Sequence, residues 1–285
     1  MAFAAAFWAV AGILAKYMMN RQIPRVVLLE MRVTLGAVIL ACTLAFKNPR
    51  LLKIKRRDIG YMLILGVVGI AGVHYTYYLA ISKIHVATAL LLQYMAPAFI
   101  LIFAVIVQHE AISFNKIFSL LLAFAGCFLV VGGYNPEIFR ANTIGIAAGL
   151  VSAIFFAFYS LYAEHGLKTY SIWTILLYGF TAAAGFWWCV HPPWKIVAAG
   201  YSWQTWLLFL ILGIFSAIVP FGCYFAGIRR IRSTSASITA MLEPVLAGII
   251  AYLFLGETLL PIQLLGGGFV LTGILLLQQK QNSIE

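Results

Sequence analysis

Long apolar runs separated by short polar gaps make up nearly all of this 285-residue chain. A membrane-spanning helix needs about 20 consecutive apolar residues, and ten of the runs come near that length. They predict transmembrane helices at about residues 2–19, 26–46, 59–80, 86–107, 117–134, 143–163, 171–190, 204–227, 233–255 and 262–278. Strands of a membrane barrel would instead show short alternating segments. The pattern therefore predicts an all-α integral membrane protein.

Composition supports this class, because 64% of the residues are hydrophobic and only 9% are charged. Soluble chains average roughly a quarter charged residues. The first run begins at Ala2 with no basic segment before it and no small-residue cleavage site after it. We therefore expect a first transmembrane helix rather than a signal peptide.

The formal net charge of +11 comes from basic residues in the gaps between runs, which indicates membrane orientation rather than nucleic-acid binding. With the N-terminus in the cytoplasm, the inner gaps hold Lys47, Arg50, Lys53, Lys55, Arg56, Arg57, Lys116, Lys168, Arg229, Arg230, Arg232 and Lys280. The outer gaps hold only Arg21, Arg25, Lys83, Arg140 and Lys195. This asymmetry predicts a multi-pass protein of the cell inner or plasma membrane with both termini cytoplasmic.

The two halves of the chain repeat one another at a shift of 147 residues. Matching pairs are Leu63–Gly66 with Leu210–Gly213, Tyr77 with Tyr224, Ile81 with Ile228, Ala89 with Ala236, Pro97 with Pro244, Glu110 with Glu257 and Gly126 with Gly273. Each repeat holds five predicted helices, and an odd number forces the second repeat to insert in the opposite sense. Inverted repeats of this kind build many secondary transporters. We assign residues 1–134 to the first repeat, 143–278 to the second and 279–285 to a cytoplasmic tail.

The chain resembles the ten-helix EamA-type members of the drug/metabolite transporter superfamily. The resemblance is carried by Trp8, by "EMR" (Glu30–Arg32), by "YMAPAFILIFAVIVQHEAIS" (Tyr94–Ser113), by "LEPVLAGIIAYLFLGETLLP" (Leu242–Pro261) and by "GGGFVLTGILLL" (Gly266–Leu277). One departure is Gln108-His109 before the first loop glutamate, where glycine is usual. The resemblance implies transport of small metabolites, often amino-acid export. It also implies a central cavity lined mainly by helices 1, 3, 4, 6, 8 and 9, with helices 5 and 10 behind it. Trp8, in the first of these helices, is a candidate substrate-binding residue.

Two prolines and one acid fall in the middle of apolar runs. Pro97 and Pro244 each remove a helical hydrogen bond and free a carbonyl one turn earlier, so they are candidate hinges. Static kinks are the alternative. Glu243 precedes only the second proline, and an intramembrane acid marks an ion or substrate pathway by default. One candidate role for Glu243 is functional, in proton coupling or substrate binding. The other is structural, as a hydrogen-bond partner of the backbone that the proline frees.

Further candidate substrate-binding residues are polar or soft side chains near the two prolines. They are His74, Tyr78, Gln93, Tyr94, Ser237 and Met241. His74 and Tyr78 share one helix face at i and i+4, and aromatic and amide groups suit an amphiphilic ligand. Packing is the alternative for His74 and for most hydroxyls in this region.

Glu30 and Arg32 open the second predicted helix near its outer end, where Lys16 closes the first. An outer gate is one interpretation, and local pairing with snorkelling to the interface is the favoured one. The four cysteines lie within apolar runs without close spacing, which predicts neither a disulfide framework nor a metal site. No cofactor is expected.

The leading functional hypothesis is a secondary transporter that exports small metabolites, such as amino acids, by alternating access, with the lipid bilayer and a small molecule as partners. Protons as a coupling ion form a separate hypothesis. Three other classes stay open at this point: a non-transporting scaffold or subunit, a channel, and a membrane-embedded enzyme. The enzyme would need acid–base groups converging at one membrane face, and the sequence offers no such set.

Overall fold

The computed structural model describes residues 1–109, 113–135, 142–255 and 260–279, and in this part of the chain the regular elements are all helical. The first repeat contains α1 (Ala2–Asn20), α2 (Arg25–Lys47), η1 (Pro49–Leu52), η2 (Arg56–Asp58), α3 (Ile59–Ile64), η3 (Leu65–Ala71), α4 (Gly72–Lys83), α5 (Val86–Gln93), α6 (Ala96–Ile106) and α7 (Phe114–Val130). The second contains α8 (Thr143–Leu167), α9 (Ile172–Val190), α10 (Pro193–Ala198), α11 (Trp203–Leu212), η5 (Gly213–Ile218), α12 (Val219–Ala240), α13 (Glu243–Leu255) and α14 (Pro261–Gln279).

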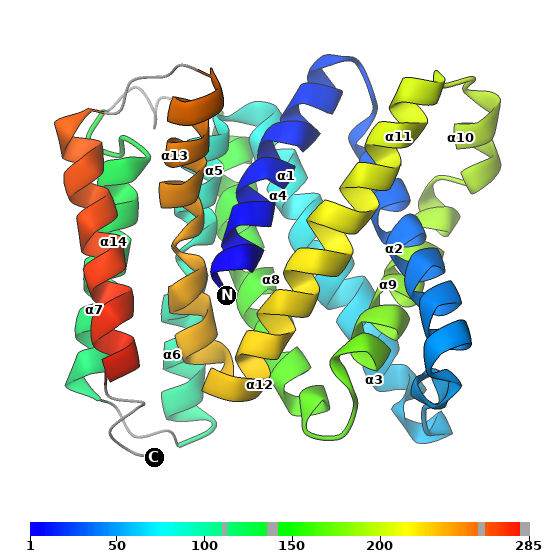
Figure 1. Ribbon diagram of the computed structural model, residues 1–285, viewed down its shortest axis with the longest axis horizontal. Coiled ribbons are helices and arrows are strands. Elements are labelled where there is room, and N and C mark those ends of the chain that lie inside the picture. Colours follow the sequence, from blue (N-terminus) through cyan, green and yellow to red (C-terminus); the bar gives the residue numbers. More distant parts are fainter. Residues whose placement is uncertain (110–112, 136–141, 256–259, 280–285) are drawn as a thin grey trace.

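These elements form a bundle of long apolar helices that run up and down across one slab (Figure 1). Seven described segments are long and apolar enough to cross a membrane, and two shorter apolar helices, α7 and α14, lie beside them. The longest segment, Trp203–Ala240, holds the eighth crossing and, after a sharp bend at Arg232 where φ is 65°, the first half of the ninth, which α13 continues. The all-α membrane fold with ten crossings in two inverted repeats is thus confirmed.

Two predicted helices are not continuous. The expected helix at 86–107 divides into α5 and α6, with Tyr94 and Met95 between them. The expected helix at 233–255 divides at Met241 and Leu242. Both breaks come just before a proline, and the break residues match at the repeat shift of 147. Proline causes them, because it has no N–H to donate to the carbonyl four residues earlier and its ring clashes with that carbonyl.

A second pair of helix irregularities follows the same symmetry. η3 and η5 are π-helical segments inside the third and eighth crossings, and residues 65–71 correspond to 212–218 at the repeat shift. A π-helical turn leaves part of the backbone without its regular partner and is often associated with function. The repeat relation therefore extends from sequence to local backbone geometry.

Helices α7 and α14 lie side by side at one edge of the bundle (Figure 1). Glycines allow this close approach: a Cβ added to Gly126 would lie 2.5 Å from the Gly266 oxygen, and one on Gly273 would lie 2.8 Å from the Ser119 oxygen. The fifth and tenth crossings are thus packed against each other with their backbones in close contact.

On the face that carries the basic loops, the two repeats are joined by polar contacts. The Tyr170 hydroxyl donates to Asp58, Thr174 Oγ1 donates to the Leu51 oxygen at 2.8 Å, and Tyr178 donates to the Leu52 oxygen at 2.6 Å. The hydrogen bond to Asp58 raises the pKa of Tyr170. The loop glutamates of the paired motifs, Glu110 and Glu257, and the end of the tail lie outside the described residues.

Candidate functional site

A buried cavity of about 50 Å³ lies where the two repeats meet. Its aromatic and polar walls are Trp8 of α1, Arg32 of α2, His74, Tyr77 and Tyr78 of α4, Gln93 of α5, Phe156 and Tyr159 of α8, Phe221 of α12 and Glu243 of α13. Small walls come from Ala11, Gly12 and Val73. These helices are crossings 1, 2, 3, 4, 6, 8 and 9. All six crossings that the family resemblance implied as cavity walls therefore line the cavity, and crossing 2 lines it as well. The fifth and tenth crossings, α7 and α14, contribute none of these residues.

Repeat-related side chains touch across this cavity. The rings of Trp8 and Phe156 are 6.3 Å apart, and those of His74 and Phe221 are 5.4 Å apart. His74 and Phe221 match at the shift of 147, and Trp8 and Phe156 at 148. The cavity thus lies on the pseudo-two-fold relation between the halves, the usual location of a transporter's binding site.

One polar network crosses from the first proline break to the second. The Tyr94 hydroxyl lies 2.9 Å from the Ala240 oxygen and 2.6 Å from Glu243 Oε2, and all three groups are buried. Ala240 is the residue whose carbonyl Pro244 frees. A tyrosine hydroxyl has one hydrogen to donate. Both contacts are full hydrogen bonds when Glu243 is protonated and donates to Tyr94, which then donates to Ala240.

Arg32 is the residue that sequence reasoning placed wrongly. Snorkelling to the outer interface was favoured, yet its side chain is only 4% exposed and lines the central cavity. One arm, Nη2, donates to the Ser216 oxygen of η5. The other, Nη1, lies 3.4 Å from the Tyr78 hydroxyl. The position of Arg32 in the sequence could have predicted this, because it lies about two turns inside α2, where a charged side chain must face protein or water.

Several polar atoms around the cavity lack a hydrogen-bond partner among the described residues. They include Arg32 Nε and the hydroxyls of Tyr77 and Tyr159. Buried polar groups in native proteins are nearly always paired, with protein or with water. Orphan groups that converge on one hollow therefore indicate that the hollow takes a polar occupant. The described residues hold no cluster of three acidic, histidine or cysteine side chains suited to a metal ion.

The predicted binding residues fall into three groups. Trp8, His74, Tyr78, Gln93 and Glu243 line the cavity. Tyr94 lies just behind it and reaches it through Glu243. Ser237 and Met241 are fully buried but are not lining residues: the Ser237 hydroxyl donates to the Thr234 oxygen, and the Met241 oxygen accepts from Cys127 Sγ. Their assignment as substrate-binding residues stays a prediction.

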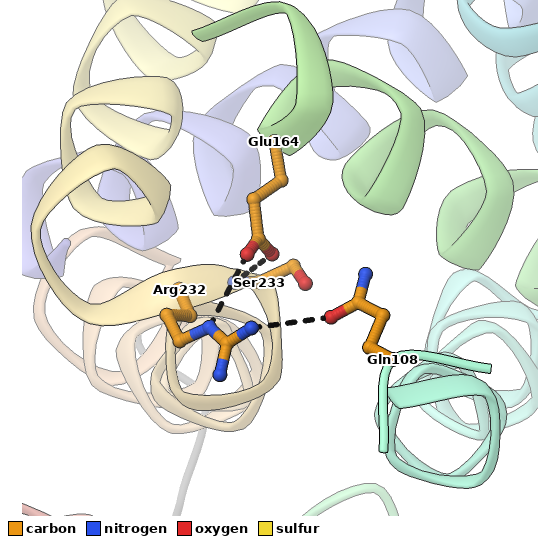
Figure 2. Close-up of polar contacts among 4 residues, drawn as sticks. All are labelled: Gln108, Glu164, Arg232 and Ser233. Atoms are coloured by element: carbon orange, nitrogen blue, oxygen red, sulfur yellow. Dashed lines mark hydrogen bonds and ion pairs between the residues drawn. The ribbon is translucent and has the colours of Figure 1, made fainter. Parts of the chain in front are cut away.

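Toward the basic face, a second cluster joins α8, α12 and the turn that follows α6. Figure 2 shows Glu164 of α8 pointing at the bend of α12. Glu164 Oε1 lies 3.4 Å from Arg232 Nε, Oε2 accepts from the Ser233 N–H at 2.8 Å, and Arg232 Nη2 contacts Gln108 at 3.4 Å. Glu164 thus supplies the acceptor for a backbone donor that the bend leaves exposed.

The opposite face is more open. A second cavity of about 660 Å³ lies there between α1, α5 and α13, and its lining includes Lys16, His85 and Pro244. Lys16 also donates to the Ile81 oxygen. Glu30 is buried and bonds His191 Nδ1 at 2.8 Å, so local pairing is correct for Glu30. The Glu164 cluster thus lies toward the basic face, beside a hollow of about 440 Å³ lined by Gln108 and His165, and the hollow of about 660 Å³ lies toward the other face.

The profile of the EamA-like transporter family matches residues 1–132 and, a second time, residues 143–278. The two matches cover both repeats. The chain belongs to the EamA-like transporter family.

Individual relatives agree with this family. An uncharacterized transporter of Archaeoglobus fulgidus is 30% identical over 70% of this chain and 70% of its own length. The uncharacterized inner membrane transporter YicL of Salmonella typhimurium is 26% identical over 96% of this chain and 92% of its own length. The threonine/homoserine exporter RhtA of Escherichia coli is 26% identical over 90% and 83%.

A solved crystal structure shares the fold, with a TM-score of 0.71, 18% identity and 96% coverage of both chains. This EamA-family chain is therefore a multi-pass membrane protein of a transporter family.

Proposed function

We propose that this protein is a secondary transporter that moves small organic metabolites, with amino acids as the leading class, out of the cell by alternating access. The observation that carries the proposal is the central cavity, where both repeats contribute orphan polar groups deep inside the bilayer-spanning bundle. A relative over most of the chain, RhtA, is named as an amino-acid exporter. Membrane interiors tolerate such polar groups where they serve a pathway.

The described conformation fits a contracted stage of that cycle. Its cavity of about 50 Å³ has room for small groups, whereas sites for drug-sized ligands span about 300–1,000 Å³. Binding a metabolite therefore requires the repeats to move apart around the cavity. The Glu164–Arg232–Gln108 cluster closes the path toward the basic face, and it must break before substrate passes there.

Breaking that closure gives a direct test of alternating access. Glu164→Gln keeps the shape of the side chain but removes its charge, so we expect opening toward the basic face. A cysteine-less protein carrying Tyr159→Cys reports it, because Tyr159 lines the cavity on the same helix. Labelling from the basic face should become faster by several-fold in Glu164→Gln. Equal labelling rates with and without the substitution would remove this cluster from the mechanism.

The repeat-related breaks at Tyr94–Met95 and Met241–Leu242 are the proposed hinges. Pro97→Ala and Pro244→Ala each restore a backbone donor, which favours a continuous, stiffer helix. We expect folded protein with reduced flux. Pro193→Ala, in the short helix α10, is the control. Wild-type flux from both hinge variants would reject the hinge role.

Coupling to protons is proposed for Glu243, because the Tyr94 and Ala240 contacts are complete only with a protonated carboxyl. Release of that proton on one face of the membrane would break the network and link transport to a pH gradient. Glu243→Gln is expected to transport without dependence on the gradient. If wild-type flux already ignores an imposed gradient, Glu243 has a structural role only.

The overall proposal is tested by counterflow in proteoliposomes that contain the purified protein and labelled amino acids. We expect saturable exchange from the wild-type protein and none from empty vesicles. A scaffold or subunit would produce no exchange, and a channel would conduct without accelerated exchange. Either result would overturn the transporter assignment.

A further inference from the structure

Arg32 lies where a charged side chain is expensive. It is seven residues into α2, about 10 Å from the start of the helix, and its side chain is 4% exposed. Guanidinium groups at such depth normally pair with an acid or reach water. No ion pair between Arg32 and a carboxylate is found in the part of the chain that the structure describes.

The contacts of Arg32 hold it in place without neutralising it. Nη2 donates to the carbonyl of Ser216, inside the π-helical segment η5, where the irregular turn makes an extra acceptor available. Nη1 has a long contact with the Tyr78 hydroxyl at 3.4 Å, and the guanidinium carbon lies 5.8 Å from the Phe221 ring. All three partners are neutral, and Nε has no partner in the described structure.

The acid that faces the same cavity is already engaged. Glu243 contacts Tyr94, and its protonated form completes that network. Arg32 attracts the Glu243 carboxyl electrostatically, but no direct ion pair joins the two in the described structure. The orphan hydroxyls of Tyr77 and Tyr159 line the cavity beside Arg32. Guanidinium and phenol groups together present several donors to one small hollow, which is the arrangement that suits a carboxylate.

We propose that Arg32 binds an anionic group of the transported molecule, a carboxylate, and so selects carboxylate-bearing metabolites over their neutral or cationic analogues. This proposal rests on the transporter function proposed above and adds the residue and the charge that set its specificity. A carboxylate is small enough for the contracted cavity, and the rest of the molecule would occupy the space that opens when the repeats separate.

The test compares matched probes on purified protein in detergent at constant ionic strength. The probes are amino acids, their primary amides and the corresponding decarboxylated amines, and the readout is the melting temperature. We expect the free carboxylates to stabilise the wild-type protein and the amides and amines to have little effect. Arg32→Gln should weaken the apparent affinity for carboxylates by about tenfold or more, as expected for lost hydrogen bonds to a charged group.

Arg25→Gln is the matched control, since Arg25 begins the same helix and contacts Ser82 at 3.0 Å instead of the cavity. It should keep the carboxylate effect. Arg32→Lys keeps the charge without the planar fork, so it serves if Arg32→Gln fails to fold, and it should retain only part of the selectivity. Equal stabilisation by acids and amides, no stabilisation by any acid, or an undiminished effect in a folded Arg32 variant would overturn the proposal.

Flux measurements separate this proposal from the function on which it rests. Carboxylates that bind through Arg32 but are not exchanged across proteoliposomes would leave the binding site standing and reject transport. Exchange of amides as fast as acids, unchanged in Arg32→Lys, would leave transport standing and reject the role of Arg32.

Discussion

The hydroxyl of Tyr94 joins the two proline-broken crossings, so removing it should loosen the centre of the bundle. Tyr94 is 2% exposed, and its hydroxyl lies 2.9 Å from the Ala240 oxygen and 2.6 Å from Glu243. Tyr94→Phe keeps the ring and its packing, but it leaves the Ala240 carbonyl and the Glu243 carboxyl without the hydroxyl as a hydrogen-bond partner. We expect a folded protein that is less stable and has altered motion at the second break.

The expected loss follows from the two contacts. Hydrogen bonds between membrane helices average about 0.6 kcal/mol and reach about 1.7 kcal/mol, so two of them give about 1–3 kcal/mol. A buried acceptor left unpaired costs about 1–3 kcal/mol by itself, which supports the upper part of that range. Tyr77→Phe is the control, because the Tyr77 hydroxyl is buried without a partner in the described structure. Its removal should cost about 0.5 kcal/mol or less.

A double-mutant cycle with Pro244→Ala tests the mechanism as well as the magnitude. That substitution supplies a backbone N–H at position 244, which can donate to the Ala240 carbonyl and replace the Tyr94 contact. Tyr94→Phe should therefore cost less in the Pro244→Ala background, as measured by reversible unfolding in mixed detergent micelles. Equal costs for Tyr94→Phe and Tyr77→Phe, or strict additivity with Pro244→Ala, would refute the assignment of Tyr94 to the freed carbonyl.

Three further outcomes are expected. Gly273→Ala puts a Cβ 2.8 Å from a backbone oxygen of α7 and should destabilise the protein by about 1–3 kcal/mol, while Gly268→Ala, with nothing within 4 Å, should be neutral or stabilising in the same unfolding assay. Gly12→Ala brings a methyl 3.2 Å from a tyrosine hydroxyl of the cavity and should lower flux while changing stability by less than about 1 kcal/mol. The hydrogen bond to Asp58 raises the pKa of the Tyr170 hydroxyl. This hydrogen bond therefore stabilises the fold fully below pH about 10, the usual pKa of tyrosine, and the stabilisation is lost as the pH rises further and the hydroxyl ionises. Above pH about 10, the melting temperature should therefore fall less steeply with pH for Tyr170→Phe than for the wild-type protein.

The crossings and the repeat were predictable from sequence because both depend on local composition and order. A run of apolar residues crosses the bilayer regardless of its neighbours. Proline matching proline at a constant shift of 147 residues reveals a duplicated unit. Five of the eight predicted binding residues line the cavity, because Trp8 came with the family resemblance and the others are polar or aromatic groups in mid-span, where they need protein or ligand partners.

The residues that sequence reasoning misplaced or missed depend on contacts between distant segments. Arg32 looked interfacial because it opens an apolar run, but η5 supplies a carbonyl 184 residues away that holds it inside. Glu164 accepts a hydrogen bond from the backbone at the bend of α12 and contacts Arg232 there. No local sequence pattern predicts this bend, because the acceptor that stabilises it comes from another helix. The helix breaks, by contrast, had a local cause in proline, and only their extent was underestimated.

The sequence by itself determined that the chain is a membrane protein with ten apolar crossings, that its halves are inverted copies, and that prolines and one acid interrupt mid-span helices. These properties follow from hydropathy, chain order and the chemistry of single residues. Only the tertiary structure decided which polar groups face a common cavity, which of them remain unpartnered, and how Tyr94 joins the two breaks. Those facts depend on how helices pack around the pseudo-two-fold relation, and the partners they bring together are separated by as many as 184 residues along the chain.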